Sequence, residues 1–370
     1  MNPFSLKVLT NPSSFCNRTQ EIATLTSYAK SNSNAVIYSP RRFGKTSLVH
    51  QVQRKLSQDG FITIYVDLFG LSSADIIANR ITKGVYSALH HQKNLLQKAV
   101  TIIKSHRPVI RPDETGVSIT TEAVSPHLSG SELLDKTLAE LGQLIAAGKK
   151  KINIVLDEFQ EITEIRDPNI EGIMRSYIQE HKASYFFVGS RRRVLLEMFN
   201  QRRRPFFQSA INFKLDKLPH DELADFVAKR FEAAQKRCSE RLADEIALTA
   251  DDHPYYCQKL SFFCFELAGK TVKETDVQKA YTELIQAETP VFEAIVQGLA
   301  PRQIALLCAV AKEPSRSLLS MDYIKRHGLK SIGGIQAAVK KLARLDLIEN
   351  GGKNKPWRVV DPIFGQWLGS

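Results

Sequence analysis

The fold is decided by the stretch Ala35-Val-Ile-Tyr-Ser-Pro-Arg-Arg-Phe-Gly-Lys-Thr-Ser-Leu48. It opens with four strand-compatible apolar residues, 35–38, and runs into a helical pattern at 46–56. A strand, a loop and a helix in that order are the context of a phosphate-binding loop. Backbone N–H groups of such a loop and the positive end of the helix dipole attract phosphate oxygens. We therefore expect Lys45 to reach the β- and γ-phosphates of a nucleotide and the Thr46 hydroxyl to contact Mg²⁺.

Nine consecutive residues make up the predicted nucleotide-binding loop. They are Ser39, Pro40, Arg41, Arg42, Phe43, Gly44, Lys45, Thr46 and Ser47. Gly44 allows the backbone to approach a phosphate closely. Ser39 stands at the position where such loops usually begin with glycine. This replacement removes neither the backbone N–H donors of the loop nor its lysine. A loop that binds nucleotide only for structure therefore stays open as an alternative.

A second element, the apolar strand 152–156, ends in Asp157 and Glu158. A carboxylate at that strand end can hold magnesium through water, and the next one can accept a proton from the attacking water. We therefore predict ATP and Mg²⁺ as cofactors. Thr46 and Asp157 are the predicted metal residues, and Lys45, Asp157 and Glu158 are predicted to be catalytic.

Further polar residues follow later strand and helix signals. Ser190 comes after the apolar segment 185–189 and is predicted to orient the water or sense the γ-phosphate, although it could equally cap the next helix. Arg202, Arg203 and Arg204 cluster after that helix. One of them, supplied to a neighbouring subunit of a homo-oligomer, could neutralise transition-state charge, and a solvated basic face is the alternative.

Short apolar runs alternate with helical patterns through the first two thirds of the chain, as in a parallel sheet with helices on its faces. The predicted strands are 35–38, 61–67, 152–157, 184–188 and 211–215. An insertion at about 71–150 holds two helical stretches. Between them, the segment 108–124 predicts a hairpin, which is either a partner-contacting element or a passive decoration.

Beyond Pro219 the strand signals stop and helical periodicity covers 221–236, 239–250 and 255–268. Pro290 is expected to open a third region, with helices at 301–312, 321–327 and 335–345, a turn at 350–352 and a short segment at 357–360. That order is typical of a winged helix-turn-helix. The predicted class is α/β: a P-loop NTPase core over 1–216 with an inserted hairpin at about 108–124, a small all-helical domain over 217–289 and a winged-helix domain over 290–370.

Composition sets wider bounds. The 370 residues, 43% apolar and 24% charged, suit two or three globular domains. A net charge of +12 favours an anionic partner, which could be nucleotide, nucleic acid or an acidic membrane surface, or it merely keeps the protein in solution. The five cysteines lack metal-binding spacing and indicate reduced thiols in a cytoplasmic protein. No apolar run approaches 18 residues, so neither secretion nor membrane spanning is expected.

The last fifth of the chain carries half of the positive surplus. From residue 290 onward there are twelve Lys or Arg and six Asp or Glu, a surplus of six out of twelve. The predicted recognition helix has an apolar stripe of Ile335, Val339, Leu342 and Leu345. Its polar residues, with those of the wing, could meet DNA phosphates: Gln336, Lys340, Lys341, Arg344, Lys353, Lys355 and Arg358. Double-stranded DNA and a protein are both open as partners of this surface.

The motifs in combination resemble a known family. The segments Phe15–Glu21, Pro40–Leu48 and Asp157–Gln160 are similar to the STAND-class (MNS clade) ATPases of archaea and bacteria, which are relatives of AAA+ ATPases. Asp252–Gln258 resembles the lid motif of that family and Val360–Trp367 its C-terminal ending, so the resemblance covers nearly the whole chain.

The resemblance implies an ATPase core, a helical lid and a winged helix, with ATP at the junction of core and lid. It further implies that Arg18 and Glu21 lie near the adenine and that His253 and Pro254 face the nucleotide. The Gly-Arg pair often found before the last core strand is absent, and Pro205–Gln208 stands in its place. The source of a sensor arginine is therefore open, with 202–204 the nearest substitutes.

The leading hypothesis is a cytoplasmic switch that binds and hydrolyses ATP, slowly without a partner, and passes its nucleotide state to that partner through the lid and winged helix. One rival is a DNA-binding initiator or recombination regulator loaded by ATP. Another is a defence or signalling module that acts through protein partners.

Overall fold

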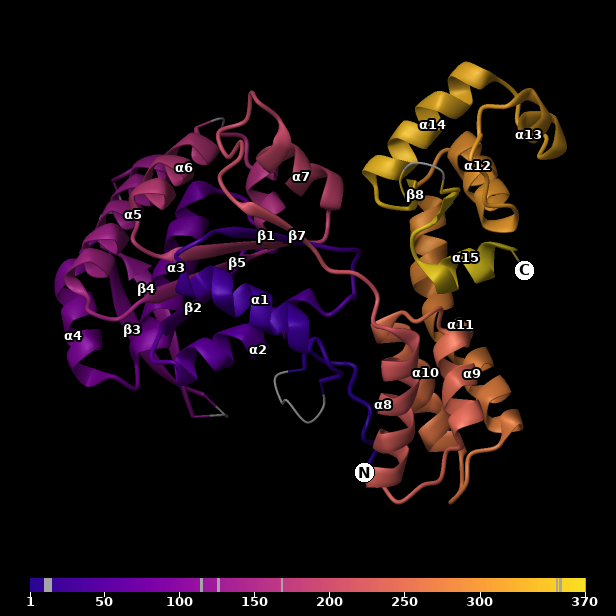
Figure 1. The fold of residues 1–370 in the computed structure, drawn as a ribbon. Helices are drawn as coiled ribbons and strands as arrows, with labels where there is room; N and C mark the ends of the chain where they lie inside the picture. The colour runs from indigo at the N-terminus through magenta and orange to yellow at the C-terminus, as the bar shows by residue number, and fades with distance from the viewer. Residues whose placement is uncertain are drawn as a thin grey trace. The chain divides into compact units, whose positions relative to one another are not determined.

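The computed structural model describes residues 1–9, 15–113, 116–124, 127–167, 169–350, 352 and 355–369 (Figure 1). Contacts divide the chain into two compact units. We call the first the sheet unit, which comprises 18–39 and 45–215, and the second the helical unit, which comprises 1–17, 40–44 and 216–370. The phosphate loop is thus divided by its contacts, because 40–44 pack with the helical unit while Lys45 and Thr46 pack with the sheet unit.

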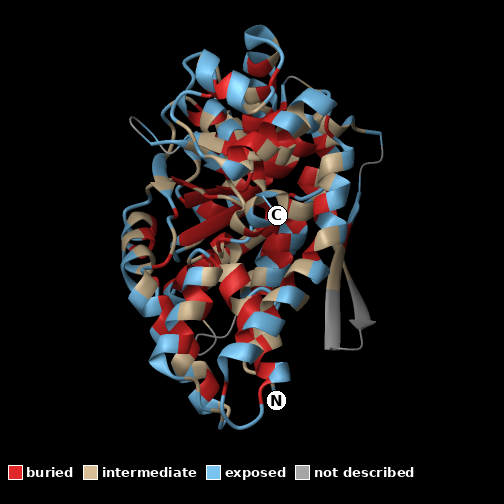
Figure 2. Cartoon of the chain, turned by 90° about the vertical axis from the view of Figure 1, so that its right-hand side faces the viewer, coloured by how far each residue is buried: buried red, intermediate tan, exposed pale blue. Residues whose placement is uncertain are grey.

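The sheet unit is built on five parallel strands in the order β2-β5-β6-β1-β7. Every residue of β5 and β6 is buried, as expected for central strands covered on both faces by helices (Figure 2). Their bounds lie within one residue of the predicted ones: β1 Ala35–Tyr38, β2 Ile62–Asp67, β5 Ile152–Asp157, β6 Ser184–Gly189 and β7 Ile211–Lys214. The predicted α/β class with a parallel sheet is confirmed.

Seven α-helices and one 3₁₀ helix surround this sheet in the described residues. They are α1 Thr19–Lys30, α2 Lys45–Gln58, α3 Ala74–Leu89, α4 Lys93–Ile102, α5 Gly130–Ala147, η2 Phe159–Glu164, α6 Ile170–Glu180 and α7 Arg192–Asn200. The insertion holds three helices where two helical stretches were expected. Its first stretch is broken at 90–92, where no glycine or proline marks the break in the sequence.

The predicted hairpin is present as β3 His106–Asp113 and β4 Gly116–Ala123, and residues 114 and 115 lie outside the described part. Buried hydrogen bonds fix the base of this hairpin within the sheet unit. Both carboxylate oxygens of Glu140 accept from the Ser105 N–H, at 3.1 and 3.0 Å, and the Tyr86 hydroxyl donates to the His106 carbonyl at 3.0 Å. These bonds satisfy backbone groups that would otherwise be buried without partners.

A half-buried histidine, His181, joins α5 and the end of α6 to β6. Burial lowers the pKa of His181 to about 4, so the ring is neutral at pH 7. A neutral ring can donate from Nε2 to the Leu138 carbonyl at 3.1 Å and accept at Nδ1 from the Tyr185 hydroxyl at 2.6 Å. Gly142 leaves room for the ring, because a Cβ there would lie 2.9 Å from Nε2.

The helical unit has one hydrophobic core, to which side chains as far apart in the chain as Phe231, Leu306 and Phe364 contribute. Its elements are α8 His220–Ala233, α9 Glu240–Thr249, α10 Pro254–Leu267, α11 Glu274–Gln297, α12 Pro301–Lys312, α13 Met321–Arg326, α14 Ile332–Arg344, β8 Ile348–Asn350, β9 Trp357–Val359 and α15 Pro362–Gly369. The elements from α12 to β9 follow the expected order of three helices and a hairpin.

Pro290, where the sequence analysis expected a third region to open, lies inside α11. A proline there removes one helical N–H bond. Leu284 and Phe292, on either side of it, are both buried in the same core, so tertiary packing holds the helix through the proline.

The predicted recognition helix differs from α14 at both ends. It starts at Ile332, because the Ser331 hydroxyl caps it by accepting from the Gly334 N–H at 3.3 Å. Leu345 is 45% exposed, and Ala338 and Ala343 are buried in its place, so this part of the predicted apolar stripe was wrong. Lys353 of the wing lies outside the described residues. In the described part of the chain, no helix is both long and apolar enough to cross a membrane.

Candidate nucleotide site

Lys45 lies in the first turn of α2 and is buried at the base of the phosphate loop. Its Nζ donates to the carbonyl oxygen of Ser39 at 3.1 Å and to the Ser39 hydroxyl at 3.4 Å. The departure from glycine at this position therefore supplies an extra oxygen to the ammonium group. Gly44 has φ +85°, a left-handed conformation that suits glycine and turns the loop into the helix.

Asp157 at the end of β5 lies directly beside the start of α2. Its Oδ2 accepts from the Thr46 hydroxyl at 2.7 Å and from the Tyr65 hydroxyl at 2.7 Å. Burial and the neighbouring Asp157 raise the pKa of Tyr65, so that hydroxyl keeps its proton. The strand order explains the meeting, since only β6 separates β5 from β1 and the carboxyl ends of parallel strands share one edge.

The Thr46 hydroxyl and the Asp157 carboxylate fit a magnesium ion. Both are hard oxygen ligands, and adjacent ligands of an octahedral Mg²⁺ lie about 3 Å apart, close to the 2.7 Å between these two oxygens. The described residues contain no group of three or more His, Cys, Asp or Glu suited to a metal. Phosphate and water oxygens would have to complete the coordination, as is usual for Mg²⁺ at nucleotides.

Glu158 follows Asp157 with the left-handed backbone angles φ 52° and ψ 42° and starts η2. Its Oε2 accepts from the Ser190 hydroxyl at 2.9 Å and from the Gln160 amide. Ser190 follows β6. This strand lies between β1, which leads into the phosphate loop, and β5, which ends in Asp157. The structure thus brings Glu158 and Ser190 together.

His253 and Pro254 begin α10 in the helical unit, with His253 as the N-cap and Pro254 at the first helical position. The His253 ring packs edge-on against Phe43 of the phosphate loop, with ring centroids 4.8 Å apart. Burial, together with the charges of Lys217 and Arg42, lowers the pKa of His253 to about 3. The ring is therefore neutral at pH 7.

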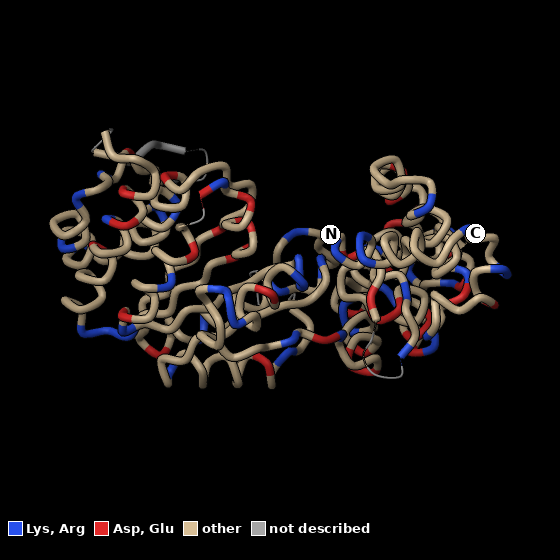
Figure 3. The backbone as a smooth tube through the Cα atoms, turned by 90° about the horizontal axis from the view of Figure 1, so that it is seen from above, with Lys and Arg blue, Asp and Glu red and all other residues tan. Residues whose placement is uncertain are grey.

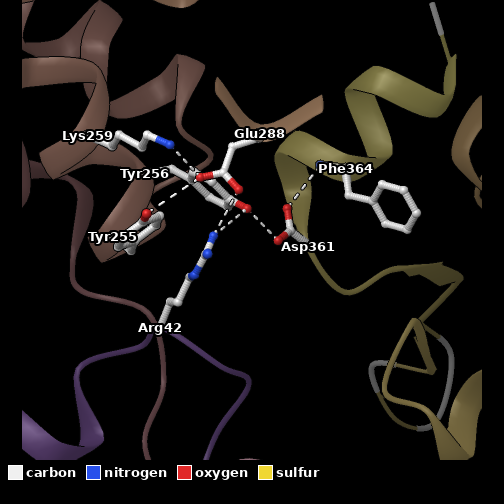
Figure 4. Close-up of polar contacts among 7 residues, drawn as sticks. All are labelled: Arg42, Tyr255, Tyr256, Lys259, Glu288, Asp361 and Phe364. Carbon is white, nitrogen blue, oxygen red and sulfur yellow. Dashed lines mark hydrogen bonds and ion pairs between the residues drawn. The ribbon is translucent and has the colours of Figure 1, made fainter. Parts of the chain in front are cut away.

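Arg42 of the loop enters a buried network of the helical unit (Figure 4). Its Nη1 lies 3.0 Å from Glu288 Oε2, and its guanidinium carbon lies 4.3 Å from the centre of the Tyr255 ring. Glu288 in α11 is 1% exposed, and its Oε1 accepts from Lys259 Nζ at 2.7 Å. Two cations thus compensate this buried carboxylate.

The network continues to the C-terminal helix. The Tyr256 hydroxyl lies 3.5 Å from Arg42 Nη1 and donates to Asp361 Oδ2 at 2.6 Å. Asp361 accepts from the Phe364 N–H at 2.9 Å at the start of α15, and burial raises its pKa. Sequence reasoning assigned no role to Tyr256, Glu288 or Asp361, although Tyr256 and Asp361 lie in segments that carry the resemblance.

The remaining predicted residues are spread around the two units. Arg18 is buried before α1 in the sheet unit, with Nη1 2.7 Å from Glu21 Oε1. Arg204 forms an ion pair with Glu171 of α6, whereas Arg202 and Arg203 are exposed. In the loop and α2, Pro40 is half-buried, Arg41 is exposed and Ser47 is buried.

Comparisons with known proteins agree with this geometry. Residues 15–180 match a family described as an ATPase domain predominantly from Archaea. Residues 290–370 match a probable winged helix domain. The chain therefore combines a P-loop ATPase domain with a winged helix.

Among solved structures, the chain is similar to the Walker-type ATPase of Pyrococcus abyssi, with a TM-score of 0.72, 15% identity and 99% of each chain covered. It is also similar to the ORC2 protein of Aeropyrum pernix in ADPNP-ADP complexes, with a TM-score of 0.57, 15% identity and 96% of each chain covered. At such identity the likeness shows the fold. No curated protein sequence matches the chain significantly.

Proposed function

We propose that the protein is an ATP-binding, Mg²⁺-dependent ATP-hydrolysing switch of the STAND or AAA+ type. The match to an ATPase domain supports nucleotide binding. The positions of Lys45, Thr46, Asp157, Glu158 and Ser190 at one edge of the sheet support hydrolysis. In this proposal Lys45 binds the β- and γ-phosphates, while Thr46 and Asp157 hold the metal ion.

Glu158 is the proposed general base. The water oxygen bonds to the γ-phosphorus, the bond from that phosphorus to the bridging oxygen breaks, and ADP and phosphate leave. Glu158 takes the water proton, and Ser190 holds the carboxylate. Bound Mg²⁺ would supply charge neutralisation at the phosphate oxygens. With Arg204 paired to Glu171, Arg202 or Arg203 is the better candidate for an arginine given to a neighbouring subunit.

The observation that carries the switch is the position of Arg42. It lies three residues before Lys45 in the phosphate loop and is bonded to Glu288 of α11. It also shares the Tyr256 hydroxyl with Asp361, the residue directly before α15 in the winged-helix match. A bound phosphate that reorders the loop would shift the Arg42 side chain. The contacts from Arg42 through Tyr256 to Asp361 would then transmit this shift to α15.

Removing the Tyr256 hydroxyl should uncouple α15 from the nucleotide. In the wild type, we expect addition of a non-hydrolysable ATP analogue to change the amide hydrogen exchange of 362–369. In Tyr256→Phe we expect that difference to vanish while the analogue still binds, because Asp361 loses the bond that joins it to the network. Basal exchange in α15 should rise, since a buried hydrogen bond to a charged group contributes about 1.5–3 kcal/mol.

Tyr281→Phe is the matched control. The Tyr281 hydroxyl also donates to α15, at 2.7 Å to Gln366 Oε1, without being part of the Arg42 network. Its removal should leave the nucleotide-dependent difference intact. A difference that survives in Tyr256→Phe as well would contradict the proposed coupling.

A second candidate function is binding of double-stranded DNA. Lys340, Lys341 and Arg344 are exposed on α14 and have no ion-pair partner among the described residues. Arg358 of β9 is partly neutralised, since it pairs with Glu349 at 2.8 Å. Elsewhere, positive and negative residues are interspersed along both units (Figure 3). The unpaired row on α14 is therefore the observation that favours an anionic duplex.

Replacing Lys340 and Lys341 by alanine should weaken DNA binding and reduce the slope of log affinity against log salt by about 2, because two phosphates would no longer be neutralised. The exposed pair Lys270 and Lys279, changed to alanine together, removes the same charge away from α14 and should leave the slope unchanged. Equal slopes for both double variants would mean that Lys340 and Lys341 do not contact the DNA phosphates. No binding at low salt would speak for a protein partner instead.

A further inference from the structure

Gln160 is a buried amide that the proposed chemistry does not yet use. It lies in η2, is 1% exposed, and donates from Nε2 to Glu158 Oε2. Its own Oε1 is buried with no hydrogen-bond partner among the described residues. A buried acceptor without a partner is unfavourable, and native proteins keep such groups mainly where a site requires the arrangement.

The neighbouring strand leaves room for this amide. A Cβ at Gly189, the last residue of β6, would lie 2.0 Å from Gln160 Oε1 and 3.1 Å from Leu195 Cδ2. Gly189 is not among the residues with positive φ, so its backbone conformation does not call for glycine. The reason for glycine here is the space that the Gln160 side chain occupies beside Ser190.

Both hydrogen bonds to the Glu158 side chain end on the same oxygen. Ser190 and Gln160 donate to Oε2, and in the part of the chain that the structure describes Oε1 has no hydrogen-bond partner. A carboxylate held through one oxygen presents the other in a fixed direction. The free oxygen is then the one that can meet a water molecule.

We propose that Gln160 is a positioning residue for hydrolysis. With Ser190 it fixes Glu158 Oε2, so that Oε1 takes the proton from the attacking water, and Gly189 is glycine to make this possible. The inference rests on the proposed function, since it requires Glu158 to be the base. It differs from a purely structural role because the bond should affect turnover without affecting ATP binding.

Gln160→Met is the first test, because methionine has a similar length and no N–H donor. We expect the single-turnover rate at saturating Mg-ATP to fall about tenfold, a fraction of the 10²–10⁴ that general base catalysis provides. The Kd for ATP should stay within about twofold, since binding and chemistry respond to different contacts. Gly189→Ala should act alike, because its Cβ displaces the flexible end of Gln160. Gly189→Ala disturbs the bond between Gln160 and Glu158 without replacing Gln160 itself. If one of the two variants fails to fold, the other can therefore still test the inference.

Gln53→Met is the control for a buried amide. Gln53 in α2 is also buried, and its Nε2 donates to the Ile64 carbonyl at 3.0 Å, away from Glu158. Its replacement should lower thermal stability and leave the hydrolysis rate unchanged. A rate loss equal to that of Gln160→Met would mean that burial, and not the bond to Glu158, matters.

The decisive comparison repeats Gln160→Met in a Glu158→Gln background. There we expect no further loss, because the residue being positioned can no longer accept a proton. A full additional loss in that background, or a wild-type rate for Gln160→Met alone, would overturn the inference. If Glu158→Gln alone leaves the rate unchanged, the proposed function fails first, which keeps the two failures distinct.

Discussion

Replacing Lys45 by alanine is expected to weaken ATP binding at least about a hundredfold, measured by isothermal titration with Mg-ATP. The Lys45 ammonium is buried at the base of the loop, where it donates to two uncharged oxygens of Ser39. An anionic phosphate oxygen accepts from an ammonium more strongly than an uncharged oxygen does. A charge-assisted hydrogen bond contributes about 1.5–3 kcal/mol. Loss of two such bonds, those from Lys45 to the β- and γ-phosphates, corresponds to a factor of about 10² or more in Kd.

Lys55→Ala is the matched control for this measurement. Lys55 lies in the last turn of the same helix and is exposed, so its replacement removes one ammonium from α2 without touching the loop. It should leave the Kd within about twofold, since exposed charges at that distance are screened. If Lys45→Ala bound ATP as tightly as Lys55→Ala, the assignment of the nucleotide site would be wrong.

The sequence predicted the sheet well because most of its strands are short apolar runs. The run 152–157 is completely buried, and Asp157 at its end and Glu158 directly after it interrupt the apolar pattern at the point where the strand ends. The loop after 35–38 is recognisable for the same reason. Strand order was not readable, however, and it is the order that brings Asp157 to Thr46 and Ser190 to Glu158.

Other parts of the site could not be predicted because their partners lie far apart in the chain. Glu288 looks like any acid of an exposed helix face until α10 and α11 bury it between Arg42 and Lys259. Tyr256 lies in the segment 252–258 that carries the resemblance, but its hydrogen-bond partner Asp361 is 105 residues away in the chain. Gln160 was visible in the segment that carries the resemblance, but its function depends on the space beside Gly189, which no local pattern reveals.

Glu158→Gln is expected to reduce ATP turnover about 10²- to 10⁴-fold while ATP binding stays within about threefold of the wild type. An amide has nearly the shape of the carboxylate, so the contact with Ser190 can persist, yet the amide cannot accept the water proton. Loss of kcat with retained affinity is the signature of a group that acts mainly in the transition state. Turnover is measured with saturating Mg-ATP and affinity with a non-hydrolysable analogue.

Glu161→Gln provides the comparison within the same 3₁₀ helix. Glu161 is a neighbouring acid that pairs with Arg191 at 2.7 Å, and its replacement removes one negative charge near the site without touching Glu158. Because a pair that is only partly buried contributes little, we expect turnover within about twofold of the wild type. Equal losses in the two variants would mean that the local charge, and not a proton acceptor at Glu158, sustains hydrolysis, and the general base would then have to be sought elsewhere along the edge formed by β1, β6 and β5.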